Sequence, residues 1–81
     1  MINYIALIHK EPEAEYSVSF PDFPGCITTG QTIDEAKYMA QHVLQFHVDD
    51  LIADGVSLPT ARTLEDVFDA TAAVTYFVSI S

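Results

Sequence analysis

Carboxylates dominate the side chains of this sequence that could do chemistry. The chain has 12 Asp and Glu residues, and two-metal hydrolysis of a phosphodiester needs several carboxylates within a few ångströms of one another. The predicted strands Met1–His9 and Ala73–Ile80 contain none. Glu35 and Asp50 lie about four turns apart on a predicted helix, too far apart to share a metal pair. The sequence therefore predicts no catalytic centre, no metal site and no cofactor.

The histidines and the single cysteine do not combine into a nucleophilic or metal-binding pair either. His9, His42 and His47 fall on different predicted surfaces. His47 lies within an apolar stripe, where a hydrogen-bonded core histidine is the ordinary explanation. Cys26 has no cysteine partner, which fits a reducing cytoplasm, and we expect it to be a small buried apolar residue.

The charge balance restricts the class of partner. Three basic residues face 12 acidic ones, for a formal net charge of −9. Such a surface repels phosphate backbones, so the chain itself is expected to bind no nucleic acid, whereas a basic protein partner would be attracted. The alternative is that the charge only keeps a small domain soluble.

Length and hydropathy predict a single folded domain over residues 1–81. Apolar residues make up 49% of the chain, which excludes intrinsic disorder. No apolar run is long enough for a membrane span and no signal peptide is visible, so we expect a cytoplasmic protein without a membrane partner. A domain of this size has a thin core, which favours a homodimer or higher oligomer.

Residue patterns predict an α+β fold of order β-β-β-α-β. Three strands should form an antiparallel meander, with a long helix on one face and a fourth strand adjacent and parallel to the first. The first strand is apolar on both sides, so something beyond the chain is expected to cover part of the helix-free face. In chain order, the predicted elements are strands at Met1–His9, Tyr16–Phe20 and Cys26–Thr29, a helix from Ile33 to about Asp54, a helical turn at Thr63–Asp69 and a strand at Ala73–Ile80.

The segment Phe20-Pro21-Asp22-Phe23-Pro24-Gly25-Cys26 predicts a stiff corner between the second and third strands. Its two prolines fix φ and remove backbone donors, and its glycine tolerates a positive φ. Asp22 and Phe23 are then expected at a rigid exposed tip, which would be either a contact loop or a plain hairpin connector.

The long helix has recognisable ends and two stripes. Thr32 and Glu35 form a capping-box pattern, and Gly55 stands where a C′ glycine is expected. The sheet-facing stripe consists of Ile33, Ala36, Ala40, Val43, Leu44, His47 and Leu51. A second stripe consists of Glu35, Met39, His42, Phe46 and Asp50. It either closes over the rim of the core or forms a contact surface.

One family carries these features in the same order. The pattern Tyr16-x-Val18-x-Phe20-Pro21-Asp22-Phe23-Pro24-Gly25-Cys26, then Gly30-x-Thr32-x-x-Glu35-Ala36 and Gly55-x-x-Leu58-Pro59, resembles the N-terminal domain of HicB-family antitoxins. The resemblance covers about residues 2–60. It implies a partial RNase H-like fold and a type II toxin–antitoxin function, in which the chain neutralises a small basic mRNA-cleaving HicA toxin. Many members carry a C-terminal DNA-binding domain, and we expect that domain to be absent from residues 1–81.

Two surfaces then compete as the toxin-binding site. The favoured one is the tip formed by Asp22 and Phe23, and the other is the helix stripe with Glu35, Met39, Phe46 and Asp50. We expect no enzyme, because a fold alone does not confer activity. The alternative function is a self-associating α/β binding or scaffold module.

Overall fold

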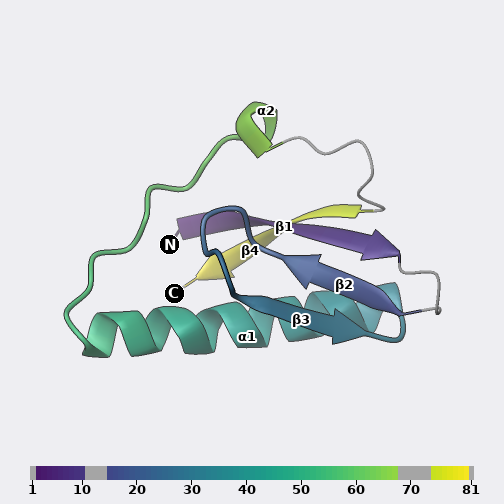
Figure 1. Ribbon diagram of the computed structural model, residues 1–81, viewed down its shortest axis with the longest axis horizontal. Coiled ribbons are helices and arrows are strands. Elements are labelled where there is room, and N and C mark those ends of the chain that lie inside the picture. The colour runs from purple at the N-terminus through teal and green to yellow at the C-terminus, as the bar shows by residue number, and fades with distance from the viewer. Residues whose placement is uncertain (1, 11–14, 68–73, 81) are drawn as a thin grey trace.

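The computed structural model describes residues 2–10, 15–67 and 74–80. Four strands form one antiparallel sheet in the order β3-β2-β1-β4, and the long helix lies along one face of it (Figure 1). This confirms the predicted α+β class. The elements are β1 (Ile2–Lys10), β2 (Tyr16–Ser19), β3 (Ile27–Gly30), α1 (Ile33–Ala53), α2 (Leu64–Val67) and β4 (Val74–Ile80).

The direction of β4 differs from the prediction. It lies next to β1, as expected, but the two strands are antiparallel, with Ile2 opposite Ile80 and Ile8 opposite Val74. The prediction of a parallel strand assumed a short crossover from the helix. Instead, the chain leaves α1 and passes round the sheet to α2 on the opposite face (Figure 1). The connection between α1 and β4 is long enough to enter β4 from the far end, which reverses the strand.

The main core lies between the sheet and α1. Alternate residues of each strand face the helix, because successive side chains of a strand point to opposite faces. On α1 the buried residues follow a spacing of four, which places them on one stripe. All seven residues of the predicted sheet-facing stripe are buried or half-buried, and Val48 joins them. The buried members are Tyr4, Ala6, Ile8, Val18, Phe20, Phe23, Cys26, Ala36, Ala40, Leu44, Val48, Val78 and Ile80.

A smaller cluster occupies the other face of the sheet. Ile5 and Leu7 of β1 point away from α1 and are buried together with Val67 of α2. Part of this face is therefore covered by the chain's own short helix, which lies on the side of the sheet opposite to α1 (Figure 1). The expectation that something beyond the chain covers β1 is wrong at these positions.

Both ends of α1 have the predicted caps. The Thr32 hydroxyl accepts from the Glu35 backbone N–H at 3.0 Å, and the Glu35 carboxylate accepts from the Gln31 N–H at 3.1 Å. At the other end, Gly55 has φ +72. Its N–H donates to the Ile52 carbonyl, and the next N–H donates to the Leu51 carbonyl, which is a Schellman motif.

Gly30 allows β3 to approach α1 closely. A Cβ at this position would lie 2.5 Å from the Ala36 nitrogen and 2.8 Å from the Ala36 Cα. Both atoms belong to the helix backbone, which cannot move aside as a flexible side chain could. The absence of a side chain here therefore sets the spacing between β3 and the first turn of the helix.

Candidate functional site

The corner between β2 and β3 forms where its sequence predicts. The Phe23 N–H donates to the Phe20 carbonyl at 3.0 Å, and the Cys26 N–H donates to the Phe23 carbonyl at 3.1 Å. These are two consecutive turns, and Gly25 takes a φ of +89, which a residue with a Cβ rarely adopts. The predicted corner is confirmed.

Phe23 does not lie at an exposed tip. Its exposed fraction is 4%. The ring makes an edge contact with Tyr4 at a centroid distance of 4.7 Å and a second with His47 at 5.7 Å. The expectation of an exposed Phe23 is wrong because the first turn bends the chain inward, so that the ring closes the core between β1 and α1.

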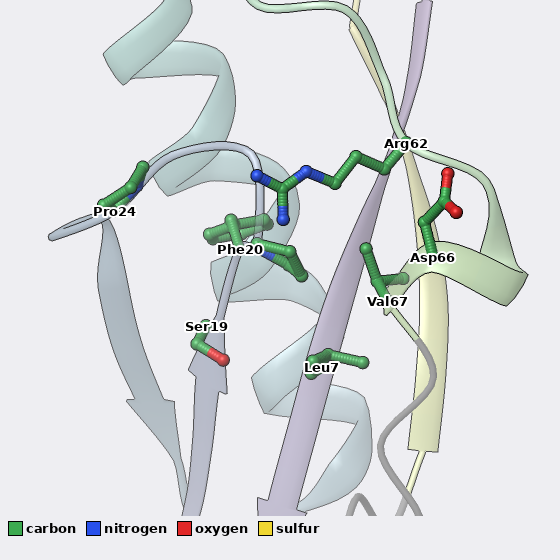
Figure 2. Close-up of a pocket in the computed structure, with 8 residues that line it drawn as sticks. Leu7, Ser19, Phe20, Pro24, Arg62, Asp66 and Val67 are labelled. Carbon is green, nitrogen blue, oxygen red and sulfur yellow. The ribbon is translucent and has the colours of Figure 1, made fainter.

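Asp22 is also engaged within the chain. Its side chain is only 3% exposed, and its carboxylate lies 3.3 Å from Nε of Arg62 and accepts from the Arg62 backbone N–H at 3.2 Å. The Arg62 side chain runs from the connector over Phe20 (Figure 2). The Tyr4 hydroxyl donates to the Pro59 carbonyl at 2.7 Å. Asp22 and Tyr4 therefore hold the connector between the two helices against the sheet through Arg62 and Pro59. We call these contacts of Asp22 and Tyr4 with the connector the clamp.

Burial raises the pKa of the Tyr4 hydroxyl, and the nearby Asp22 carboxylate raises it further. Burial likewise raises the pKa of the Cys26 thiol. Cys26 is the small buried residue that the sequence predicts. Both groups are held in their neutral forms, so neither is prepared to act as a nucleophile.

The second predicted surface is a real exposed surface. We call the side of α1 that carries Glu35, Met39, His42, Phe46 and Asp50 the helix flank. Phe46 is 78% exposed, Glu35, His42 and Asp50 are exposed, and Met39 is half-buried. The flank therefore does not close over the core rim, since its largest apolar side chain lies in solvent.

The acidic residues near the C-terminal end of α1 are unfavourable for the helix dipole. The helix carries Asp34, Glu35, Asp49 and Asp50 against one lysine, and its last turn has no basic residue. The C-terminal end of a helix is already the negative end of its dipole, so acidic residues there destabilise it. Asp50 follows Phe46 by one turn, so this unfavourable charge lies on the helix flank.

The chain uses its own cations elsewhere. Arg62 is paired with Asp22. The Lys10 amine lies 4.7 Å from the centre of the Tyr16 ring, and the Lys37 amine lies 5.3 Å from that of Tyr76. These three are the only Lys and Arg residues of the sequence. Each already has an aromatic or acidic neighbour away from the helix flank.

The described surface also has hollows outside the helix flank. One of about 510 Å³ lies between the corner and α2, lined by Leu7, Ser19, Phe20, Pro21, Pro24, Arg62, Asp66 and Val67 (Figure 2). The other, of about 490 Å³, lies over β2 and β3. Among residues 2–10, 15–67 and 74–80, no group of three or more His, Cys, Asp and Glu side chains is placed to hold a metal ion. Within the same residues, no helix is both long and apolar enough to cross a membrane.

Sequence reasoning missed Arg62 as the partner of Asp22 and expected Phe23 to be exposed, whereas its ring is buried. Arg62 gave no signal, because its role depends on where the connector crosses the corner. The residues of the helix flank lie together on one side of α1, as their spacing predicts, and their role in binding stays a prediction. Asp22 and Phe23 are also brought together, but as interior groups.

Comparison with known proteins places these features in a family. The sequence matches, over residues 4–80, the family described as HicB_like antitoxin of bacterial toxin-antitoxin system. It is 36% identical over 59 residues to Antitoxin HicB 2 of Photorhabdus laumondii subsp. laumondii, a match that covers 73% of this chain and 42% of that protein. The chain thus spans less than half the length of this curated relative.

Solved structures agree with the sequence match. The N-terminal domain of antitoxin HicB from Burkholderia pseudomallei superposes with a TM-score of 0.87 at 30% identity, covering 99% of both chains. A chain of a toxin–antitoxin complex from Streptococcus pneumoniae superposes with a TM-score of 0.84 at 27% identity, covering 99% of this chain and 69% of that one. The chain therefore belongs to the HicB-like antitoxin family of bacterial toxin–antitoxin systems.

Proposed function

We propose that this chain binds and neutralises a small basic mRNA-cleaving toxin of the HicA type, and that it does so through the helix flank. The observation that carries the proposal is Phe46, a large aromatic side chain that lies 78% exposed with Asp50 one turn further along the same flank. Large apolar anchors supply most of the lifetime of an interface, whereas charge supplies orientation and association rate.

Two further observations support this surface over the corner, and a third supports a toxin as the partner. Asp22 and Phe23 are occupied inside the protein, so neither can reach a partner without breaking the clamp. The acidic last turn of α1 lacks a cation, and a basic partner would supply one. The Streptococcus pneumoniae relative was solved in a toxin–antitoxin complex, which makes a toxin the natural partner to test.

The test is calorimetric titration with a purified HicA-type toxin. Phe46→Ala should weaken binding by about 2 kcal/mol, the scale of an interface hot spot, which is roughly 30-fold in Kd. Ile52→Ala is the matched control, because Ile52 is 57% exposed and lies about 120° around the same helix. It should bind as wild type does.

Charge is tested separately by stopped-flow kinetics. Asp50→Asn should lower the association rate and reduce its dependence on salt, while the dissociation rate changes little. If Phe46→Ala and Asp50→Asn both bind like wild type, the helix flank is not the contact. The 510 Å³ hollow beside α2 then becomes the next surface to mutate.

The competing function is a self-associating binding or scaffold module, which would bind no toxin at any concentration. We also infer that the chain has no nuclease activity, because its strands contain no carboxylate, and that it does not bind DNA at a net charge of −9. Incubation with RNA in Mg²⁺ and a gel shift with its promoter at low salt test these two inferences. Cleavage abolished by Glu35→Gln, or a specific shift, would contradict them.

A further inference from the structure

The outer edge of β4 is a feature that the proposed function leaves unused. In the described sheet, β4 pairs with β1 alone, so its other edge carries backbone N–H and C=O groups without a strand partner. The strand is seven residues long and contains no charged residue and no proline. Its register with β1 is unbroken from Val74 to Ile80. Natural proteins normally protect such an edge with charges, prolines or bulges, because it can pair with another strand.

One hydrogen bond shows which residues present their backbone groups to this edge. The Ser79 carbonyl accepts from Nε2 of Gln41 at 2.6 Å, so it points away from β1. Backbone direction alternates along a strand, with both groups of one residue pointing to the same side. Thr75, Phe77 and Ser79 therefore direct their N–H and C=O groups to the free edge, while the residues between them bond to β1.

We propose that β4 pairs antiparallel with β4 of a second copy of this chain, around a twofold axis at Phe77. The four strands of each copy then form one continuous sheet of eight. In this register Phe77 lies opposite Phe77, and Thr75 lies opposite Ser79. The N–H of Thr75 from the second copy replaces the Gln41 amide on the Ser79 carbonyl, so no buried carbonyl is left without a donor.

Phe77 explains why the axis is placed there. It is the central residue of β4 and is 53% exposed. Its side chain lies on the same sheet face as its cross-strand neighbour Ile5, which is buried. In the proposed pair two Phe77 rings meet across the strands, and aromatic cross-strand pairs stabilise a sheet. A large apolar side chain in mid-strand thereby becomes covered.

Charge identifies the occupant as a second copy. The chain has 12 acidic residues, and none of them lies in β1, β2, β3 or β4. Two copies that approach through α1 or α2 bring carboxylates together, whereas two β4 edges bring none. A basic partner gains nothing at this uncharged edge, so the edge suits the chain itself better than it suits a toxin.

The proposed dimer leaves the helix flank free. Lys37 and Gln41 contact β4 residues, so they mark the side of α1 that lies beside this edge. Phe46 is nine positions after Lys37, which places it about 180° around the helix. The inference is therefore independent of the proposed function, and each copy of the dimer presents its own helix flank.

The test is mass as a function of concentration, measured by light scattering and sedimentation. The wild-type chain should have twice the chain mass at tens of micromolar and dissociate on dilution. Phe77→Lys places a like charge on the twofold axis and should raise the dimer dissociation constant at least about tenfold. The matched control is Phe46→Lys, the same substitution on the helix flank, which should leave the dissociation constant unchanged.

A second variant keeps the test independent of the side chain. Thr75→Pro removes a backbone donor from the free edge without removing a bond to β1, so the fold is retained while strand pairing is blocked. In the wild type, hydrogen exchange should slow at Thr75, Phe77 and Ser79 as concentration rises. Tyr76 and Val78 should be protected at every concentration. Circular dichroism confirms that each variant is folded.

Several outcomes overturn the proposal. A wild-type chain that stays monomeric at high micromolar concentration excludes the dimer. A dimer that persists in folded Phe77→Lys and Thr75→Pro uses another surface. Hydrogen exchange that depends on concentration at Tyr76 and Val78 as much as at Thr75, Phe77 and Ser79 shows that the strand frays and does not pair.

Discussion

Replacing Phe23 with alanine removes the ring that joins the corner to the core. A buried phenylalanine removes about 150–250 Å² from water, which at about 25 cal/mol per Å² is roughly 4–6 kcal/mol as an upper bound. Phe→Ala substitutions in cores cost about 3–5 kcal/mol. Because Phe23 is 4% exposed and contacts both Tyr4 and His47, we expect a loss of about 4 kcal/mol in the free energy of unfolding.

Such a loss is a large share of the stability of a small domain, which is about 4–12 kcal/mol at this length. At about 4–8 °C per kcal/mol, the melting temperature should fall by roughly 15–30 °C. The assay is urea and thermal unfolding followed by circular dichroism. Phe46→Ala is the control, since it deletes the same ring from a site that is 78% exposed. It should change stability by less than about 0.5 kcal/mol.

Measuring Phe23→Ala and Phe46→Ala side by side shows which of the two rings is buried. If Phe23→Ala costs less than about 1 kcal/mol, the ring is not a core residue and the corner is open to a partner after all. If Phe46→Ala is the more destabilising of the two, Phe46 is the buried ring and the helix flank is not exposed. Either result would return the corner to the list of contact surfaces.

Three further predictions concern the close contact, the helix cap and alkaline pH. Gly30→Ala should lower stability by about 1–3 kcal/mol in urea unfolding, because its Cβ would meet the Ala36 backbone at 2.5 Å. A variant as stable as wild type would show that the strand and helix can separate freely. Thr32→Ala should cost about 1 kcal/mol by loss of the cap to the Glu35 N–H, and no loss would mean that the cap is replaced by water. The raised pKa of Tyr4 stabilises the fold fully below its unfolded value of 10.0, and this stability is lost as pH rises through the folded pKa. The free energy of unfolding, measured from about pH 8 to 11.5, should therefore fall above about pH 10. Tyr4→Phe should make this fall smaller. If the free energy of unfolding of Tyr4→Phe falls as steeply as that of wild type, other groups cause the loss of stability.

Local patterns predicted the fold well where one short segment decides the structure. Thr32, Glu35 and Gly55 determine the ends of α1 through contacts within a few residues, so capping rules were sufficient. The corner is similar, since two prolines and Gly25 leave few conformations. The apolar spacing of α1 also predicted which side meets the sheet, since that spacing repeats along the whole helix.

Long-range geometry accounts for what the sequence did not predict. The side of the corner on which Phe23 points depends on Tyr4 and His47, which are far away in the chain. The antiparallel β4 depends on the path from α1 past α2. No local rule pairs Asp22 with Arg62 across 40 positions. The helix flank was predicted because its residues are neighbours on one helix.

Inhibition of RNA cleavage decides whether this chain neutralises a toxin through the helix flank. A purified HicA-type toxin is incubated with RNA and increasing amounts of wild-type chain, of Ile52→Ala, or of the double variant Phe46→Ala with Asp50→Asn. Wild type and Ile52→Ala should stop cleavage at about equimolar ratio, while the folded double variant should require a large excess. Cleavage that continues under excess wild type would contradict the proposed function, and inhibition by the double variant at the wild-type ratio would contradict the surface.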